Sequence, residues 1–202
     1  SSPFTWYHQH VIGHHSYTNL HEDPDLHHGS YLFRYHPERE HKFWFRFQVY
    51  YLVFLWSIVV ASLAFVFDIE LMLRESYHNI VKSMQISTSR KVAHYMGRLI
   101  AFSMIFVWPY FMSHFSWTQS VIWSLLPHII FSICFSFCTQ IGHLTSETVN
   151  ERSSDWYAHQ VSVSHSFAPE SFLWFIFTGG LNLQTEHHLF PGVNSWNLRR
   201  IQ

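Results

Sequence analysis

Apolar residues gather in three runs in the middle of the chain, with polar, histidine-rich segments before and after them. The first run, 47–67, has no charged residue and is long enough to cross a bilayer as a helix. The other two runs, 99–112 and 121–138, are joined by a short connection at 114–120. They predict a transmembrane helical hairpin. We therefore expect an all-α integral membrane protein with a histidine-rich cap on the cytosolic side.

The distribution of Lys and Arg predicts the orientation of the hairpin. Neither residue occurs between 99 and 151, whereas both occur in the segments 34–46 and 74–98. By the positive-inside rule, the connection at 114–120 faces away from the cytosol. If both histidine-rich ends face the cytosol, the run 47–67 cannot cross fully, and we expect it to lie in the interface or to be re-entrant. The alternative is that it crosses and that residues 68–98 contain a return.

Composition agrees with a membrane protein. Hydrophobic residues make up 48% of the 202 residues and charged residues only 12%, against about 25% charged residues in soluble domains. The net charge of −1 suggests no nucleic-acid partner. Cys134 and Cys138 lie four apart in an apolar run, which indicates packing rather than a disulfide.

Two clusters of paired histidines carry the strongest chemical signal. The first contains His10, His14 and His15, and the second contains His187 and His188. On an α-helix His10 and His14 share a face, whereas His15 is rotated from His14 by about 100°. We therefore expect His10 and His14 to serve one metal ion and His15 a neighbouring one. Neutral imidazole suits Fe, Zn and Cu.

The positions of the remaining histidines along the chain indicate their expected roles. His143 ends the hairpin on the cytosolic side, and we expect it to be a further ligand. His128 would lie about 22 Å below it on a continuous helix, and we expect it to be buried and hydrogen-bonded. His114 is excluded because it lies on the far connection. His8, His159 and His165 remain open as candidates. Solvated or interfacial positions are expected for His21, His27, His28, His36, His41, His78 and His94.

Both clusters resemble motifs of one family. The residues 9–19, Gln-His-Val-Ile-Gly-His-His-Ser-Tyr-Thr-Asn, with Asp-Pro-Asp-Leu at 23–26, resemble the second histidine box of membrane fatty acid desaturases. The residues 179–191, which contain Gln-Thr-Glu-His-His, resemble the third box. Gln184 stands where the first histidine of that box is usual, which is typical of front-end desaturases. The resemblance covers nearly the whole chain.

The resemblance implies a non-haem centre of two iron ions at the cytosolic face of the endoplasmic reticulum. It implies dioxygen-dependent insertion of a cis double bond into a fatty acyl chain carried by a lipid or by coenzyme A. Electrons would come from cytochrome b5, fused or separate, and its reductase. The metal site implied by the resemblance comprises His10, His14, His15, His143, Gln184, His187 and His188.

The resemblance also implies what lies outside these residues. The first histidine box, any cytochrome b5 domain with its His-Pro-Gly-Gly motif, and the C-terminus are expected elsewhere in a longer protein. Residues 1–202 are then a partial desaturase domain that is inactive alone. Thr185 stands where Ile is usual, and His165 is a spare candidate ligand. We expect an acyl tunnel near 167–177, although ordinary packing explains those aromatic residues equally well.

The sequence leaves three alternative functions open. A hydroxylase or acetylenase would use the same site with a different outcome. A non-catalytic membrane carrier of metal or haem would need ligands along an intramembrane path, for which His128 is the one candidate. A zinc hydrolase lacks its usual His-Glu-x-x-His motif here.

Overall fold

The computed structural model describes residues 2–27, 31–35, 39–77, 81–82, 85–112, 114–146, 148 and 152–202. The regular secondary structure of these residues is helical, as expected, apart from one short antiparallel ladder between β1 (Ser76–Tyr77) and β2 (Val81–Lys82). The polar first segment forms α1 (Pro3–Trp6), a π-helix (Tyr7–His14), α2 (His15–Tyr17) and α3 (Pro24–His27).

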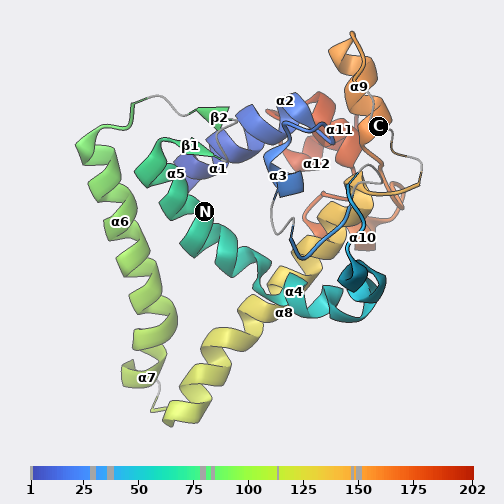
Figure 1. Ribbon diagram of the computed structural model, residues 1–202. Coiled ribbons are helices and arrows are strands. Elements are labelled where there is room, and N and C mark those ends of the chain that lie inside the picture. Colours follow the sequence, from blue (N-terminus) through green and yellow to red (C-terminus); the bar gives the residue numbers. More distant parts are fainter. Residues whose placement is uncertain are drawn as a thin grey trace.

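The membrane hairpin predicted from the two later runs is supported by helices of sufficient length. The first arm combines α6 (Thr88–Phe102), a π-helical turn (Ser103–Val107) and α7 (Trp108–Met112). The second arm is α8 (Trp117–His143), which starts with a capping box between Ser116 and Gln119. Both arms are long and apolar enough to cross a membrane. In Figure 1 the chain descends along α6 and α7 and returns along α8.

The basic segment 68–98 contributes to two helices. It contains α5 (Asp68–Arg74) and the first part of α6. The hairpin arm therefore begins eleven residues before the apolar run that predicted it, at Thr88 rather than at residue 99. Arg90, Lys91 and Arg98 lie in these added turns. A hydrophobicity pattern marks the apolar part of a helix, whereas the helix itself continues through its charged end.

The first apolar run forms a bent element instead of one straight helix. It comprises a 3-10 turn (Phe43–Phe47), α4 (Gln48–Ser62), a π-helical turn (Leu63–Phe67) and α5. The segments Phe43–Trp56 and Val59–Arg74 meet at 66°, which fits a broken span or a re-entrant loop. In Figure 1 the bent element lies beside the upper part of α8 and does not reach the lower tip of the hairpin. Whether it crosses the membrane stays a prediction.

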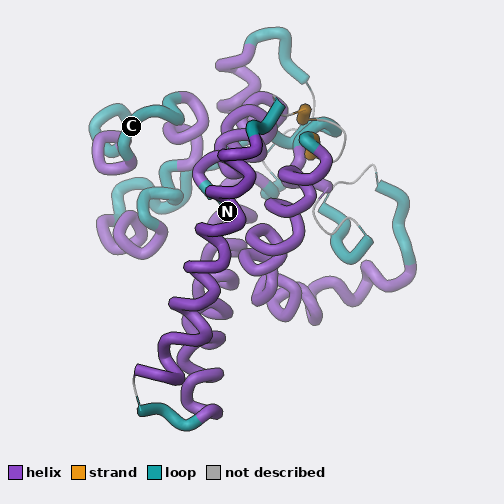
Figure 2. The backbone as a smooth tube through the Cα atoms, turned by 90° about the vertical axis from the view of Figure 1, so that its left-hand side faces the viewer, coloured by secondary structure: helices purple, strands orange, loops and turns teal. Residues whose placement is uncertain are grey.

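The C-terminal segment consists of short helices beside the upper end of the hairpin. These are α9 (Trp156–Val163), α10 (Phe172–Thr178), α11 (Gln184–Leu189) and α12 (Ser195–Leu198). Phe175, Leu183 and Leu198 form a small buried cluster that joins α10 to the segments after it. Gly180 has a φ of +92°, and a side chain there would meet Ser195. Figure 2 shows the hairpin projecting away from this group of shorter helices.

The prediction for His128 is half correct. Its ring nitrogen Nδ1 lies 2.7 Å from the carbonyl oxygen of Ser124, so the side chain is hydrogen-bonded as expected. The residue is exposed rather than buried, although its ring stacks against that of Phe106 in the other arm of the hairpin. Its polar group is satisfied within its own helix, which allows it to sit in an apolar run.

Candidate metal centre

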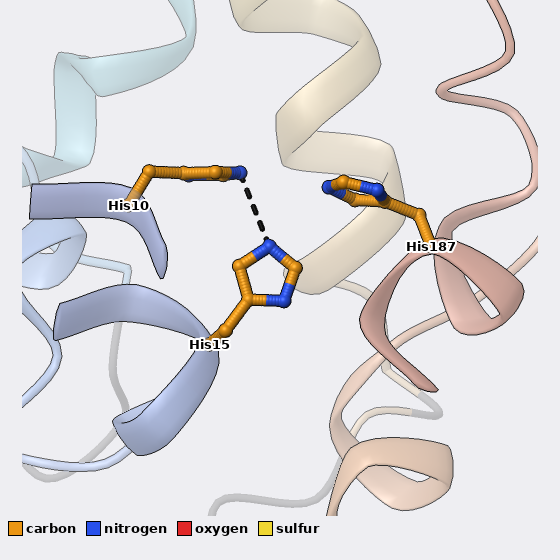
Figure 3. A group of neighbouring side chains, drawn as sticks. All are labelled: His10, His15 and His187. Atoms are coloured by element: carbon orange, nitrogen blue, oxygen red, sulfur yellow. Dashed lines mark hydrogen bonds between the residues drawn. The ribbon is translucent and has the colours of Figure 1, made fainter. Parts of the chain in front are cut away.

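Six histidines from three separate parts of the chain meet in two groups of three. His10, His15 and His187 form the first group, and Figure 3 shows their rings turned toward one another. The second group is made of His14, His143 and His188. Within each group the candidate ligand nitrogens lie within 4.8 Å of one another. All six are residues that the sequence singled out.

The grouping is partly the one expected for the first cluster. His10 falls with His14 and Asp25 in a third group of potential ligands, as the expected pairing requires, but it also falls with His15. The cause is the π-helix at Tyr7–His14, whose hydrogen bonds run from residue i to i+5. Its wider turn aligns residues five apart, so Nε2 of His10 lies 3.2 Å from Nε2 of His15. The neighbours His187 and His188 point into different groups, as expected.

Hydrogen bonds fix which nitrogen of each ring carries the proton in the second group. Nδ1 of His143 lies 3.2 Å from the carbonyl oxygen of Val163 and donates to it. Nδ1 of His188 donates to Oε1 of Gln160 at 2.9 Å, and the amide of Gln160 in turn donates to the carbonyl of His15. Both rings therefore present an unprotonated Nε2, and these two atoms lie only 3.0 Å apart. Nε2 of His143 also lies 3.3 Å from Nε2 of His14 and 2.8 Å from the amide nitrogen of Gln184, so it has donors beside it when no metal is bound.

His14 completes this group and is held by two carboxylates. Its Nδ1 lies 3.0 Å from Asp23 and 3.4 Å from Asp25. Burial lowers the pKa of His14, but these carboxylates outweigh it and raise the pKa to about 9. A protonated Nε2 of His14 then donates to Nε2 of His143 at 3.3 Å. A bound metal ion would replace this proton, because imidazole binds metals in its neutral form.

The other rings are held in the neutral form that metals require. Burial lowers the pKa of His15 to about 3 and that of His187 to about 4. Burial, aided by neighbouring histidines, also lowers the pKa of His10 and His188 well below the usual value. Nδ1 of His10 is buried without a hydrogen-bond partner among the described residues. The donor set therefore fits a pair of transition-metal ions with nitrogen ligands.

Gln184 lies against the second group. Its amide nitrogen is 2.8 Å from Nε2 of His143, while its carbonyl oxygen is buried without a hydrogen-bond partner in the described structure. Gly142 makes this position possible, since a Cβ at residue 142 would lie 2.8 Å from Cγ of Gln184. No sequence pattern singles out Gly142 in advance.

Replacing Gly142 by alanine is expected to displace Gln184 and to disturb His143, the next residue in the chain. The added methyl group overlaps the Gln184 side chain, which must move away from the metal centre. We expect the iron content of the purified full-length protein to fall. Gly97→Ala is the matched control, since nothing lies within 4 Å of the new methyl group there. Equal iron content in the two variants would refute a role for this contact.

The histidines outside the two groups have other contacts. His8 bonds to the carbonyl of Phe4, and His159 bonds to that of Thr18. Neither they nor His165 belong to a group of potential ligands among the described residues. His94 is buried and lies 3.1 Å from the hydroxyl of Ser2, so of its two expected positions, solvated or interfacial, the solvated one is wrong. His21, His41 and His114 are exposed. The side chain of His27 and all of His28, His36 and His78 lie outside the described structure.

A cavity of about 120 Å³ opens beside the histidines. His10, His14 and His143 contribute to its wall together with apolar residues of α4 and α8. The expectation of a tunnel near 167–177 is not met by this cavity, because none of those residues lines it. Phe175 instead packs with Leu183 and Leu198, and most of its neighbours in α10 are exposed. The apolar lining comprises Trp6, Leu26, Phe33, Trp56, Val59, Leu63, Phe135, Leu144 and Leu181.

Several residues that hold the histidines were missed from sequence. The resemblance to the second histidine box includes Asp23 but gives it no role, although a carboxylate so close to a histidine cluster suggests a hydrogen-bond partner for a ligand. Thr18 donates to Gln160, and both contact Nδ1 of His188. Gln160 lies in an unremarkable polar stretch, so no local signal identifies it. Residues that orient ligands in this way affect metal affinity almost as strongly as the ligands.

Comparison with known proteins identifies the family. A family model described as Fatty acid desaturase matches residues 1–202. The chain is 28% identical over 206 residues to a Delta(5) fatty acid desaturase of Dictyostelium discoideum, covering 96% of the chain and 44% of the relative. It is 28% identical over 201 residues to an acyl-lipid (8-3)-desaturase of Physcomitrium patens, covering 96% and 42%. It is 28% identical over 203 residues to an sn-1 linoleoyl-lipid 6-desaturase of Synechocystis, covering 95% and 55%.

The chain thus spans about half the length of these relatives or less. No solved structure matches it. The matching family model covers every residue of the chain, and its description agrees with the family that the two histidine clusters resemble. The chain belongs to the fatty acid desaturase family.

Proposed function

We propose that this chain is part of a membrane fatty acyl desaturase and supplies six imidazole ligands to two iron ions. The observation that carries the proposal is the meeting of six histidines in two groups of three, in each of which the ligand nitrogens lie within 4.8 Å of one another. His14, His143 and His188 supply one three-nitrogen site. His10, His15 and His187 supply a second such site next to it. We propose Gln184 as a weak ligand of the second group's iron ion through its carbonyl oxygen.

The bound iron pair would supply the dioxygen-dependent removal of two hydrogens from adjacent methylenes, which no side chain can perform. The chain's own part is to position the acyl chain and to exclude water. The cavity beside His10, His14 and His143 has a wall of apolar and aromatic residues. Such a wall suits a methylene chain because it makes few directional bonds. The second group is almost fully buried, which keeps bulk water away from its nitrogens.

The relatives narrow the proposed substrate class. Their names describe a Delta(5), an (8-3) and a linoleoyl-lipid 6-desaturase. We propose a front-end desaturase that inserts a cis double bond toward the carboxyl end of a long acyl chain. Cytochrome b5 as electron donor, the endoplasmic reticulum as location and a cytosolic active site belong to the same proposal. The charge distribution around the hairpin supports this orientation.

A non-catalytic carrier is less well supported. Transport across the membrane needs ligands along the hairpin. His128 already bonds to the carbonyl of Ser124 and lies apart from the six clustered histidines. A hydroxylase or an acetylenase would be distinguished from a desaturase by the product that it forms.

Expression of the full-length protein with defined fatty acids tests the proposal. We expect mass spectrometry to detect a product lighter by two hydrogens, formed only with dioxygen and an electron donor. Removal of metal with a chelator should abolish the product, and added Fe²⁺ should restore it. A hydroxylated product, or full activity after complete iron removal, would overturn the proposal.

A further inference from the structure

The bend in α4 coincides with the insertion of a side chain from α8. Ser132 donates its hydroxyl to the carbonyl oxygen of Trp56 at 2.6 Å and accepts the N–H of Val60 at 3.0 Å. In a straight α-helix these two backbone groups, four residues apart, bond to each other. A side chain that enters this ladder is a recognised cause of a sharp helix bend. The 66° bend between Trp56 and Val59 lies at this point.

The surroundings of Ser132 make its hydroxyl hard to replace. The residue is 0% exposed and lies inside a helix long and apolar enough to span a membrane. Bulk water is absent at such a depth, so backbone polar groups must find partners within the protein. Without the hydroxyl, the N–H of Val60 and the carbonyl of Trp56 can satisfy each other only by closing the ladder. Closing the ladder straightens the helix.

The bend shapes the cavity beside the histidines. Trp56 lies before the bend, whereas Val59 and Leu63 lie after it, and all three line the cavity. The opposite wall comes from α8, beginning with Phe135, which is less than one turn from Ser132. A change in the bend therefore moves Leu63 relative to Trp56. Ser132 itself is not among the residues that line the cavity.

We propose that Ser132 is a positioning residue that sets which acyl chains are accepted and which carbons face the metal centre. It acts through the bend, by fixing the relative places of Trp56, Val59 and Leu63 in the cavity wall. The inference rests on the proposed desaturase function. It predicts that the loss of one hydroxyl, remote from the histidines, changes selectivity while leaving the metal centre assembled.

The test compares Ser132→Ala with Ser120→Ala in the full-length protein. Ser120 is also a buried serine of α8, but its hydroxyl has no hydrogen-bond partner among the described residues. Each protein receives acyl chains of increasing length, and the amount of product and the double-bond position are measured. A difference of one methylene group in the fit of a substrate changes an enzyme's discrimination between two substrates about tenfold or more. We expect Ser132→Ala to lower the preference for the favoured acyl chain over chains of other lengths about tenfold. Its iron content should not change. Ser120→Ala should keep the wild-type profile.

A second variant and a distance measurement keep the test decisive. Ser132→Cys retains the size of the side chain with a weaker donor, so its profile should shift in the same direction. Spin labels at the exposed positions Tyr50 and Leu73, with Cys134 and Cys138 replaced, report the bend directly. We expect a longer separation in Ser132→Ala than in wild type.

Two results would overturn this role of Ser132. One is a wild-type product profile in both variants, and the other is a changed profile without a change in distance. If the wild-type protein forms no desaturated product, the proposed function fails instead. The spin-label distance still reports on the bend in that case, so the two failures are distinguishable.

Discussion

Replacing His143 by alanine is expected to abolish desaturation by the full-length protein and to lower its iron content. Nε2 of His143 lies within 3.3 Å of the ring nitrogens of both His14 and His188. Removing this ring leaves the second group with two nitrogens, and a buried two-nitrogen site holds iron poorly. We expect iron to fall from about two ions to about one per chain, because each group of three histidines is a separate site. Elemental analysis and product analysis on the same preparation provide the measurement.

His128→Ala is the matched control for this variant. It removes the same ring from the same helix, but His128 is exposed and belongs to no ligand group among the described residues. Iron content and activity should remain at wild-type levels. Full iron content in His143→Ala would contradict the assignment of the second group.

Replacing Asp23 by asparagine is expected to weaken metal binding or activity about 10- to 100-fold, the usual effect of losing a residue that orients a ligand. The carboxylate accepts hydrogen bonds from Nδ1 of His14 and from the backbone N–H groups of Asn19 and Asp25. Asparagine has one acceptor oxygen, so it cannot serve all three donors. The ring of His14 is then free to turn or to exchange its proton position, which removes Nε2 from the site.

Titration of the metal-free protein with Fe²⁺ measures this loss. Glu22→Gln is the control, because Glu22 pairs with Arg152 at the surface and belongs to no group of potential ligands among the described residues. An affinity for iron that is equal in Asp23→Asn and wild type would show that Asp23 does not orient His14.

The ligand candidates were recognisable from sequence because paired histidines beside apolar runs are rare and costly. All six histidines that meet in the structure come from the two clusters or from the end of the hairpin. The separation of His187 from His188 was predictable because they are adjacent, but the pairing of His10 with His15 was not. An α-helical spacing pairs His10 with His14, whereas the π-helix pairs His10 with His15. Hydropathy contains no information about this change of helix type.

Contacts between distant segments explain what else the sequence could not predict. Gln160 is 28 residues from His188 in the chain, and Ser132 is 76 residues from Trp56. Neither pairing follows from a local pattern. The aromatic residues at 167–177 suggested an acyl tunnel because composition does not distinguish a cavity wall from packing or from lipid-facing surface. The hairpin was predictable because its signal is local, but the 66° bend depends on a residue of another helix.

The central claim is that six histidines of this chain form two adjacent nitrogen-ligated iron sites. Mössbauer spectroscopy of the full-length protein loaded with ⁵⁷Fe, combined with the iron-to-protein ratio, tests it most directly. The account predicts about two high-spin iron ions per chain in sites rich in nitrogen, and the loss of one signal in His143→Ala. A single iron ion per chain in the wild-type protein, or an unchanged spectrum in His143→Ala, would contradict it.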